Sequence, residues 1–258
     1  MKTLIFKKEL TPPRFAGIGR PTGGFRREDG QFVALCSEFD RLFWQGRQMS
    51  KGHKLLYRLS LYDGNLDHLI GVFDDARYPI NDVAFHPSRP LVAIGTGSYD
   101  GGWCFEGDLL LWDWESGETF NLLGESREVV KCRFIDDRRL AVLLRPRDED
   151  DFQEDDDNEC VGLIIDNFCD FSESGYKLAR YNQDPRLVNL KPVDPKDFGF
   201  NKPVDQLNDP SKSFFNAIKG VSDFEQRGIV WDILFLSEDK ICVVHEKCHL
   251  EIWDTQGK

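Results

Sequence analysis

Residues 80–113 read INDVAFHPSRPLVAIGTGSYDGGWCFEGDLLLWD, and this stretch decides the fold. Two apolar runs, Ile80 to Phe85 and Leu91 to Thr96, flank the short turn HPSR, which is the pattern of a β-hairpin. A longer Gly-rich connection then leads to a third apolar run that ends at Trp112 and Asp113. The stretch therefore predicts a strand, a tight turn, a second strand, a variable loop and a third strand.

The same arrangement recurs along the chain. The strings VVKCRFIDDRRLAVLL from Val129 and IVWDILFLSEDKICVV from Ile229 align with it, with their turns in register. An apolar, alternating run that closes on an acidic residue occurs at Asp63, Asp113, Asp166 and Asp254. A repeat of about forty to fifty residues is typical of propellers and solenoids.

Another short apolar run follows two of these Asp residues, HLIGVF from His68 and TFNLLG from Thr119. Each unit then has four strands, which predicts an all-β chain of four-stranded antiparallel sheets. The pattern resembles the WD-repeat β-propeller family, whose four-stranded blades end their third strand in Trp-Asp. The residues that carry the resemblance are Asp63, Trp112, Asp113, Asp166, Trp253 and Asp254.

The resemblance implies one β-propeller domain over residues 1–258 with about four recognisable units. We expect units at about 10–75, 76–125, 126–181 and 227–258, an N-terminal strand at 2–9 and an inter-blade insertion at 182–226. Two arrangements are open: a four-bladed ring in which the N-terminal strand completes the last blade, and an incomplete propeller whose other blades come from elsewhere. We favour the incomplete one. The insertion either packs back on the propeller or offers an apolar stripe to a partner.

The units also depart from the family pattern. Family repeats carry a Gly-His pair before the first strand and an Asp in the turn before the third, which form a buried polar network with the Trp. Here the second unit opens with RYP from Arg77 and the third with SRE from Ser126, and Lys247 occupies the turn position of the fourth. We therefore expect degenerate blades that lack this network.

Composition restricts the class of protein. Hydrophobic residues make up 40% of the chain and aromatic residues 12%, a composition that can form a core. The net charge of -12 makes nucleic acid and anionic membranes poor partners. The apolar run in MKTLIFKKEL is too short for a signal peptide or a membrane span. The seven Cys residues lie mostly in apolar runs, which predicts a reducing, cytoplasmic location.

The long connections predict one loop-rich face. In an up-and-down meander, the loop between the second and third strands lies at the same edge of the sheet as the connection between blades. Long loops occur at these positions from Gln45, Gly97 and Arg145, whereas the opposite edge has only short turns such as HPSR and SEDK. Variable loops on a scaffold commonly carry function, so this face is the predicted binding surface.

Two features of this face are candidate binding elements. Trp103 and Phe105 lie in a Gly-rich loop, where large aromatic side chains either anchor a partner protein or fold back over the blade. The run from Asp148 to Glu159 holds nine carboxylates and is either a docking patch for a basic partner or a solvated loop. Its predicted contact residues are Asp148, Glu149, Asp150, Asp151, Phe152, Glu154 and Asp155.

The sequence predicts neither a metal site nor a cofactor. The acidic run lacks the residue spacing of a calcium-binding loop. Cys242, His245, Cys248 and His249 are close in sequence, but strand alternation places Cys242 and His245 on opposite faces, which disfavours zinc.

Enzyme motifs are also missing from the sequence. There is no nucleophile elbow, phosphate loop, zinc-protease helix or dinucleotide fingerprint. By analogy of fold, we expect a non-catalytic scaffold that binds a protein partner through the loop-rich face. The alternatives are a propeller hydrolase with a site in the central channel, and an obligate subunit of a larger assembly, which would self-associate when isolated.

Overall fold

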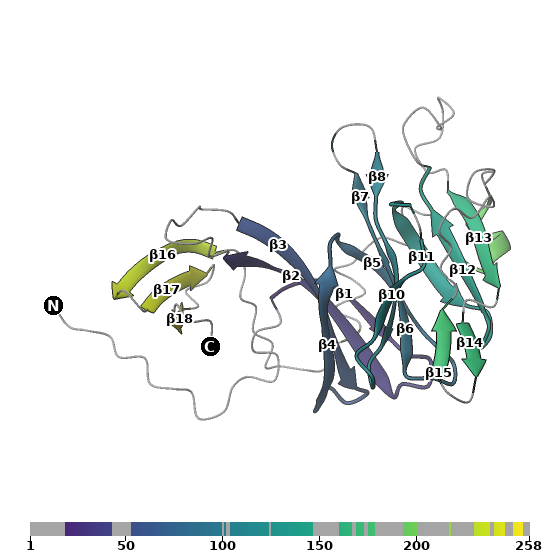
Figure 1. Cartoon of the computed structure of the whole chain (residues 1–258), viewed down its shortest axis with the longest axis horizontal. Coiled ribbons are helices and arrows are strands. Elements are labelled where there is room, and N and C mark those ends of the chain that lie inside the picture. Colours follow the sequence, from purple (N-terminus) through teal and green to yellow (C-terminus); the bar gives the residue numbers. More distant parts are fainter. Residues whose placement is uncertain are drawn as a thin grey trace.

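The chain folds into consecutive antiparallel sheets, shown in Figure 1. The computed structural model describes residues 19–42, 53–99, 101, 104–123, 125–146, 160–166, 169–172, 175–178, 193–200, 217, 230–237, 240–245 and 250–254. The expected N-terminal strand at 2–9 lies outside these residues.

The first two sheets are four-stranded, as the repeat pattern predicts. The first blade has the order β1-β2-β3-β4, with β1 (Arg20–Arg26), β2 (Phe32–Leu42), β3 (His53–Asp63) and β4 (Leu69–Ala76). The second blade has the order β10-β9-β6-β5, with β5 (Ile80–Phe85), β6 (Leu91–Thr96), β9 (Leu109–Asp113) and β10 (Thr119–Asn121). The strands expected within residues 80–121 are therefore confirmed.

Two later sheets have three strands each among the described residues. The third blade consists of β11 (Val129–Phe134), β12 (Arg139–Leu144) and β13 (Val161–Asp166). The next segment forms a separate hairpin of β14 (Cys169–Ser172) and β15 (Gly175–Leu178), because two residues connect these strands and a short loop closes readily. The last sheet consists of β16 (Val230–Ser237), β17 (Lys240–His245) and β18 (Leu250–Asp254).

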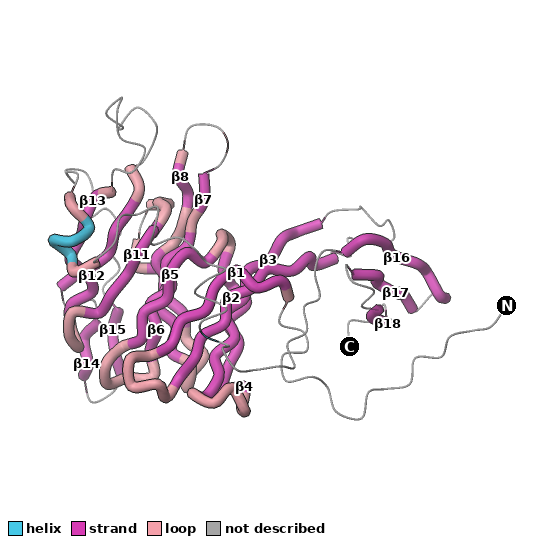
Figure 2. Tube along the Cα trace, turned by 180° about the vertical axis from the view of Figure 1, so that it is seen from behind, coloured by secondary structure: helices cyan, strands magenta, loops and turns pink. Residues whose placement is uncertain are grey.

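The first three sheets pack face to face as propeller blades do, with their inner strands β1, β5 and β11 adjacent (Figure 2). One apolar layer lies between the first and second blades and includes Leu59 and Ile94. A second layer lies between the second and third blades and includes Leu111 and Val142. Because full burial of one such side chain contributes about 1.5–3 kcal/mol, these two layers hold the blades together.

The Trp-Asp pair that ends β9 has two separate structural roles. The ring of Trp112 packs across the first layer onto Phe73 of β4, with 5.8 Å between ring centroids. The carboxylate of Asp113 accepts from the backbone N–H groups of Glu115 and Ser116 and so closes the turn into β10. Asp63 accepts from Asp67 N–H at 2.7 Å in the corresponding turn of the first blade. The Asp therefore recurs because it closes the turn, even where no Trp precedes it.

A buried ion pair joins the inner strands of the second and third blades. Lys131 Nζ lies 3.0 Å from Asp82 Oδ1, and the backbone N–H of Cys132 donates to Asp82 Oδ2 at 2.9 Å. Burial raises the pKa of the Asp82 carboxyl, and the Lys131 ammonium opposes this shift. The pair specifies how β5 and β11 align, because a displaced strand would leave a buried charge without its partner.

At the short-turn edge, His86 connects the second blade to the third. Its Nδ1 accepts from the N–H groups of Ser88 and Arg89, so the proton lies on Nε2, which donates to the carbonyl of Asp137 at 3.1 Å. Ser88 Oγ donates to the Asp137 carboxylate at 3.0 Å and not to the imidazole. His86 and Ser88 therefore connect two neighbouring turns through hydrogen bonds, and Ser88 is not activated by the imidazole.

A side chain at Gly71 should weaken the first apolar layer. A Cβ atom there would lie 3.1 Å from Trp112 Cη2, which is tighter than ordinary van der Waals contact. We expect Gly71→Val to lower the free energy of unfolding by about 1–3 kcal/mol through overpacking, measured by urea denaturation. Ile70→Val, at the exposed neighbouring position, is the control and should change stability by less than about 0.5 kcal/mol. Equal effects of the two substitutions would contradict the packing role of Gly71.

His86 should make the fold less stable in mild acid. Burial lowers the pKa of its imidazole, so between that value and the ordinary value of about 6.5 the unfolded chain binds the proton and the folded chain does not. The stabilisation is complete above pH 6.5 and is lost as the pH falls below it. The free energy of unfolding, measured by urea denaturation at pH 7.5 and 5.5, should therefore fall less in His86→Leu than in the parent chain. An identical fall in the free energy of unfolding in the two chains would contradict the role of the buried, uncharged His86.

Candidate functional site

The bases of the long loops after β6 and β12 lie at one edge of the blades, while the long loop from Gln45 lies outside the described residues. The turn before β5 meets the loop after β6, where Gly97 N–H donates to Pro79 O at 2.9 Å. The connection between the second and third blades meets the same loop, where Arg127 N–H donates to Gly107 O at 3.1 Å. The loop after β12 continues this edge, since Arg145 N–H donates to Glu128 O at 3.0 Å. Four connections therefore form one loop-rich face.

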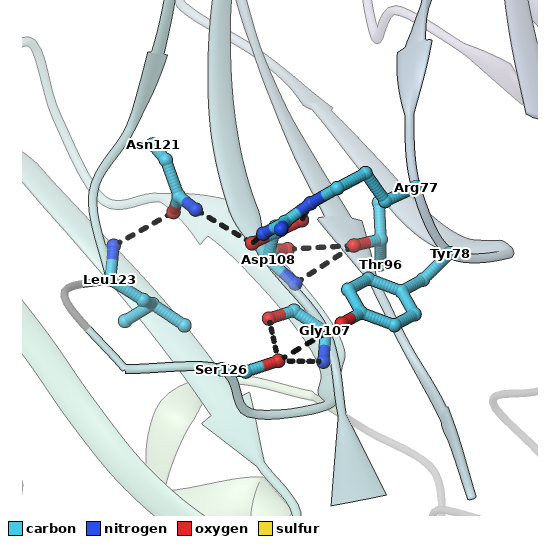
Figure 3. Close-up of polar contacts among 8 residues, drawn as sticks. All are labelled: Arg77, Tyr78, Thr96, Gly107, Asp108, Asn121, Leu123 and Ser126. Carbon is cyan, nitrogen blue, oxygen red and sulfur yellow. Dashed lines mark hydrogen bonds and ion pairs between the residues drawn. The ribbon is translucent and has the colours of Figure 1, made fainter. Parts of the chain in front are cut away.

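The carboxylate of Asp108 is the centre of a polar network at this face (Figure 3). It is buried at the start of β9 and accepts from Arg77 Nη2 at 2.7 Å, Arg77 Nε at 3.1 Å and Asn121 Nδ2 at 2.6 Å. The backbone N–H of Asp108 donates to Thr96 Oγ1, and that hydroxyl donates to Asp108 O at 3.1 Å. The network joins the inter-blade connection to β6, β9 and β10.

The sequence predicts that the family's polar network, which includes the Trp, is missing. The second blade has a different polar network, in which Arg77 of the RYP stretch bonds Asp108. Asp108 supplies the acidic residue in the turn before the third strand. A long guanidinium can reach the carboxylate from the exposed side and bond it twice, so His is not required.

Ser126 joins the second blade to the third at the same face. Its hydroxyl accepts from Gly107 N–H at 3.0 Å, lies 3.1 Å from Gly107 O and lies 3.4 Å from the hydroxyl of Tyr78, as Figure 3 shows. The backbone at position 107 passes so close to its neighbours that it requires glycine, because a Cβ there would lie 2.1 Å from Thr96 O. The loop before β9 is therefore held from both sides.

A two-stranded hairpin extends outward from this supported base. It consists of β7 (Ser98–Tyr99) and β8 (Phe105–Glu106), which stand beyond the ends of the neighbouring strands at the top of Figure 1. Tyr99 and Phe105 are cross-strand partners with ring centroids 5.2 Å apart, and the Arg145 guanidinium lies 5.9 Å from the Phe105 ring. Tyr99 is 42% exposed, and Cys104, which precedes Phe105 in the chain, is also exposed. The hairpin therefore presents an aromatic surface.

Polar contacts hold the base of the hairpin. Asn81 Nδ2 lies within hydrogen-bond distance of Gly97 O at 3.2 Å, Glu128 Oε1 at 3.1 Å and Val129 O at 3.2 Å. Burial raises the pKa of the Glu128 carboxyl, while the Arg145 charge and the Asn81 hydrogen bond oppose the shift. These groups connect the second blade, the hairpin and the start of β11, so the aromatic pair has a defined position.

Of the predicted binding residues, the structure describes Phe105. It is half-buried between Tyr99 and Arg145, which combines the two expected outcomes: the ring packs back, and the hairpin that carries it is exposed. Trp103 and the acidic residues Asp148, Glu149, Asp150, Asp151, Phe152, Glu154 and Asp155 lie outside the described residues. Tyr99 and Arg145 were missed. The Asp-Gly-Gly turn after Tyr99 signals a hairpin and could have identified Tyr99 as the partner of Phe105.

Within the part of the chain that the structure describes, no group of three or more His, Cys, Asp or Glu residues is placed to hold a metal ion. Side chains of the Cys242 to His249 cluster lie outside it. No helix in the described residues has the length and apolar character needed to cross a membrane.

Removal of the Asp108 carboxylate should destabilise the second blade. The Arg77 side chain is 62% exposed and can be solvated, so we expect Asp108→Ala to cost about 1–3 kcal/mol, less than the loss of one partner from a fully buried pair. The measurement is urea denaturation, with the exposed Glu118→Ala as the control. Equal unfolding midpoints for the two variants would show that the network does not support the loop-rich face.

Comparisons with known proteins leave the family of this chain open. No family model matches the chain, and no curated protein matches it. The β-propeller domain of Myceliophteria thermophila Cps50 (Swd1) is 11% identical with a TM-score of 0.35 and covers 92% of this chain and 52% of its own. The propeller domain of the Trilobed protease from Pyrococcus furiosus is 12% identical with a TM-score of 0.38 and covers 95% and 57%.

A third solved structure, Pyrococcus horikoshii acylaminoacyl peptidase, is 11% identical with a TM-score of 0.38. It covers 95% of this chain and 32% of its own. The chain therefore spans between a third and slightly more than half of the length of these structures. The assignment of a propeller-type fold rests on the strand order and blade packing described above.

Proposed function

We propose that the chain is a non-catalytic scaffold that binds a protein partner through its loop-rich face. The observation that carries the proposal is the β7–β8 hairpin, which extends from the blades with Tyr99 exposed beside the Phe105 and Arg145 pair. Tyr and Arg are enriched among the residues that dominate interface energies.

The support beneath the hairpin favours binding. A partner that docks on a mobile loop must order it, whereas contacts from Asn81 and Ser126 already hold the neighbouring connections in place. The Arg145 guanidinium limits the motion of the Phe105 ring. Pre-organisation of this kind improves affinity without additional contacts.

The partner that fits this face is a protein with a basic surface. The net charge of the chain is -12, and the acidic run from Asp148 to Glu159 lies in the connection that leaves β12 beside Arg145 and returns at β13. Charge complementarity of this kind mainly raises the association rate and is screened by salt. The aromatic pair would supply the salt-independent part of the affinity.

Loss of the exposed ring should reduce binding selectively. We expect Tyr99→Ser to weaken recovery of the partner by roughly thirtyfold, the effect of losing a residue worth about 2 kcal/mol. The measurement is quantitative affinity purification of tagged full-length chain from its source cells, followed by titration of the recovered protein. The control is Leu69→Ser, which removes a more exposed apolar side chain, at 54% exposure, from β4. Equal binding of the partner by the parent chain, Tyr99→Ser and Leu69→Ser would overturn the assignment of this face.

A further inference from the structure

One segment of the inter-blade insertion packs on the third blade. The residues Val193–Phe200 contain the short 3-10 helix η2 (Pro195–Phe198), which lies beside β12 and β13 in Figure 2. Phe200 and Cys160 are buried in one cluster with Val130 and Leu143, and Val193 packs against it. The N–H of Val193 donates to Cys160 O at 3.0 Å, so the segment is joined to the blade by its backbone as well.

The segment has defined ends, as an element adapted to one position does. Asp194 Oδ1 accepts from Lys196 N–H at 2.9 Å and caps the first turn. Gly199 ends the helix with a φ of 77°, a conformation that glycine adopts readily. Arg133 Nη1 of β11 donates to Gly199 O at 3.0 Å, and a Cβ on Gly199 would lie 2.5 Å from the same nitrogen. The left-handed backbone at position 199 therefore favours glycine, and the guanidinium packs closely against it.

The blade is shaped to receive the segment. A Cβ on Gly162 of β13 would lie 2.2 Å from the Phe198 ring, so that ring rests directly on the strand backbone. Any larger residue at 162 would displace it. A glycine within a strand commonly marks such a close approach.

The covered surface is the outer face of the third blade, the face that points away from the second. Val142 and Leu163 belong to the layer shared with the second blade, and strand alternation places Leu143 and Gly162 on the other side. In an array of blades this outer face is where the next sheet packs. The insertion segment occupies that position, and Leu143 is fully buried there.

The same insertion also reaches the opposite end of the array. Arg26 of β1 donates to the carbonyl of Ala217 at 3.3 Å, and Ala217 is buried. Phe25 packs toward the second blade, so Arg26 lies on the outer face of the first blade, paired with the fully buried Val33. The 16 residues between Phe200 and Ala217 can span up to about 55–60 Å, whereas three blades stacked about 10 Å apart need less.

We propose that the insertion caps the stack of the first three blades, covering the outer face of the third blade and the outer face of the first. Terminal units of stacked repeats need a cover that their neighbours do not supply, and an in-chain segment supplies it at each outer face. The cap is independent of partner binding at the loop-rich face.

Cys160 reports directly on the cap of the third blade. Its thiol lies beneath Phe200, and burial raises its pKa to about 11, which slows alkylation further because the thiolate is the nucleophile. The experiment is site-resolved maleimide labelling of the full chain followed by peptide mass spectrometry. Exposed Cys104 is the fast reference, and Cys132, buried between the second and third blades, reports on global opening.

Release of the cap should expose Cys160 alone. We expect Phe200→Ser to raise its labelling rate at least about tenfold while Cys132 stays protected, because local opening precedes global unfolding. Asp194→Ala, a milder change that removes the helix cap, should raise it less, and Lys196→Ala on the exposed side of the same helix should not. If Cys160 and Cys132 accelerate together in both cap variants, or Cys160 labels as fast as Cys104 in the parent chain, the proposal is overturned.

The cover on the outer face of the first blade is tested with an introduced thiol. Val33→Cys places a reporter on the outer face of the first blade, opposite Arg26. We expect it to be protected, and Arg26→Ala in that background to accelerate its labelling without affecting Cys160. Light scattering supplies an independent readout: the parent chain should be monomeric, and Phe200→Ser should self-associate through the uncovered face. A self-associating parent chain, or an unprotected thiol at position 33, would contradict the cap.

Discussion

Face-to-face packing of one blade on the next is the constraint on which this structure depends. The third blade is apolar on both sides, since Leu143 and Val142 are adjacent in β12 and both fully buried. A single antiparallel sheet of this kind could not be stable in water. Every outer face must therefore be covered, and the insertion residues on the third blade follow from the same physical requirement that produces the repeat.

The polar connections at the two edges of the blades have different roles. At the short-turn edge, His86 and Asp137 join neighbouring turns directly, which leaves little room for variation. At the loop-rich edge, Asp108 and Ser126 hold only the bases of the connections, so the β7–β8 hairpin can extend beyond them. Rigid bases and projecting tips are a common arrangement in binding scaffolds.

The inner strands carry the main electrostatic cost of the fold. Asp82 and Lys131 are both buried where β5 and β11 meet, and a buried ion pair generally gives little net stability over apolar residues of the same volume. Its value here is alignment of two strands, β5 and β11, in support of the polar contacts that His86 and Asn81 make between the same two blades. The thiols of Cys36 and Cys132 near this pair have raised pKa values, chiefly because they are buried, and they serve as small apolar groups.

Local patterns in the sequence were sufficient to identify β5, β6, β9 and β10 and the turns closed by Asp63 and Asp113. These features depend on alternation and on hydrogen bonds within a few residues. The approach of Arg77 to Asp108, the pairing of Arg145 with Phe105 and the contact of Phe198 with Gly162 arise only in the tertiary structure. Their partners are far apart in sequence, and blade stacking brings them together, so no local pattern encodes the contact.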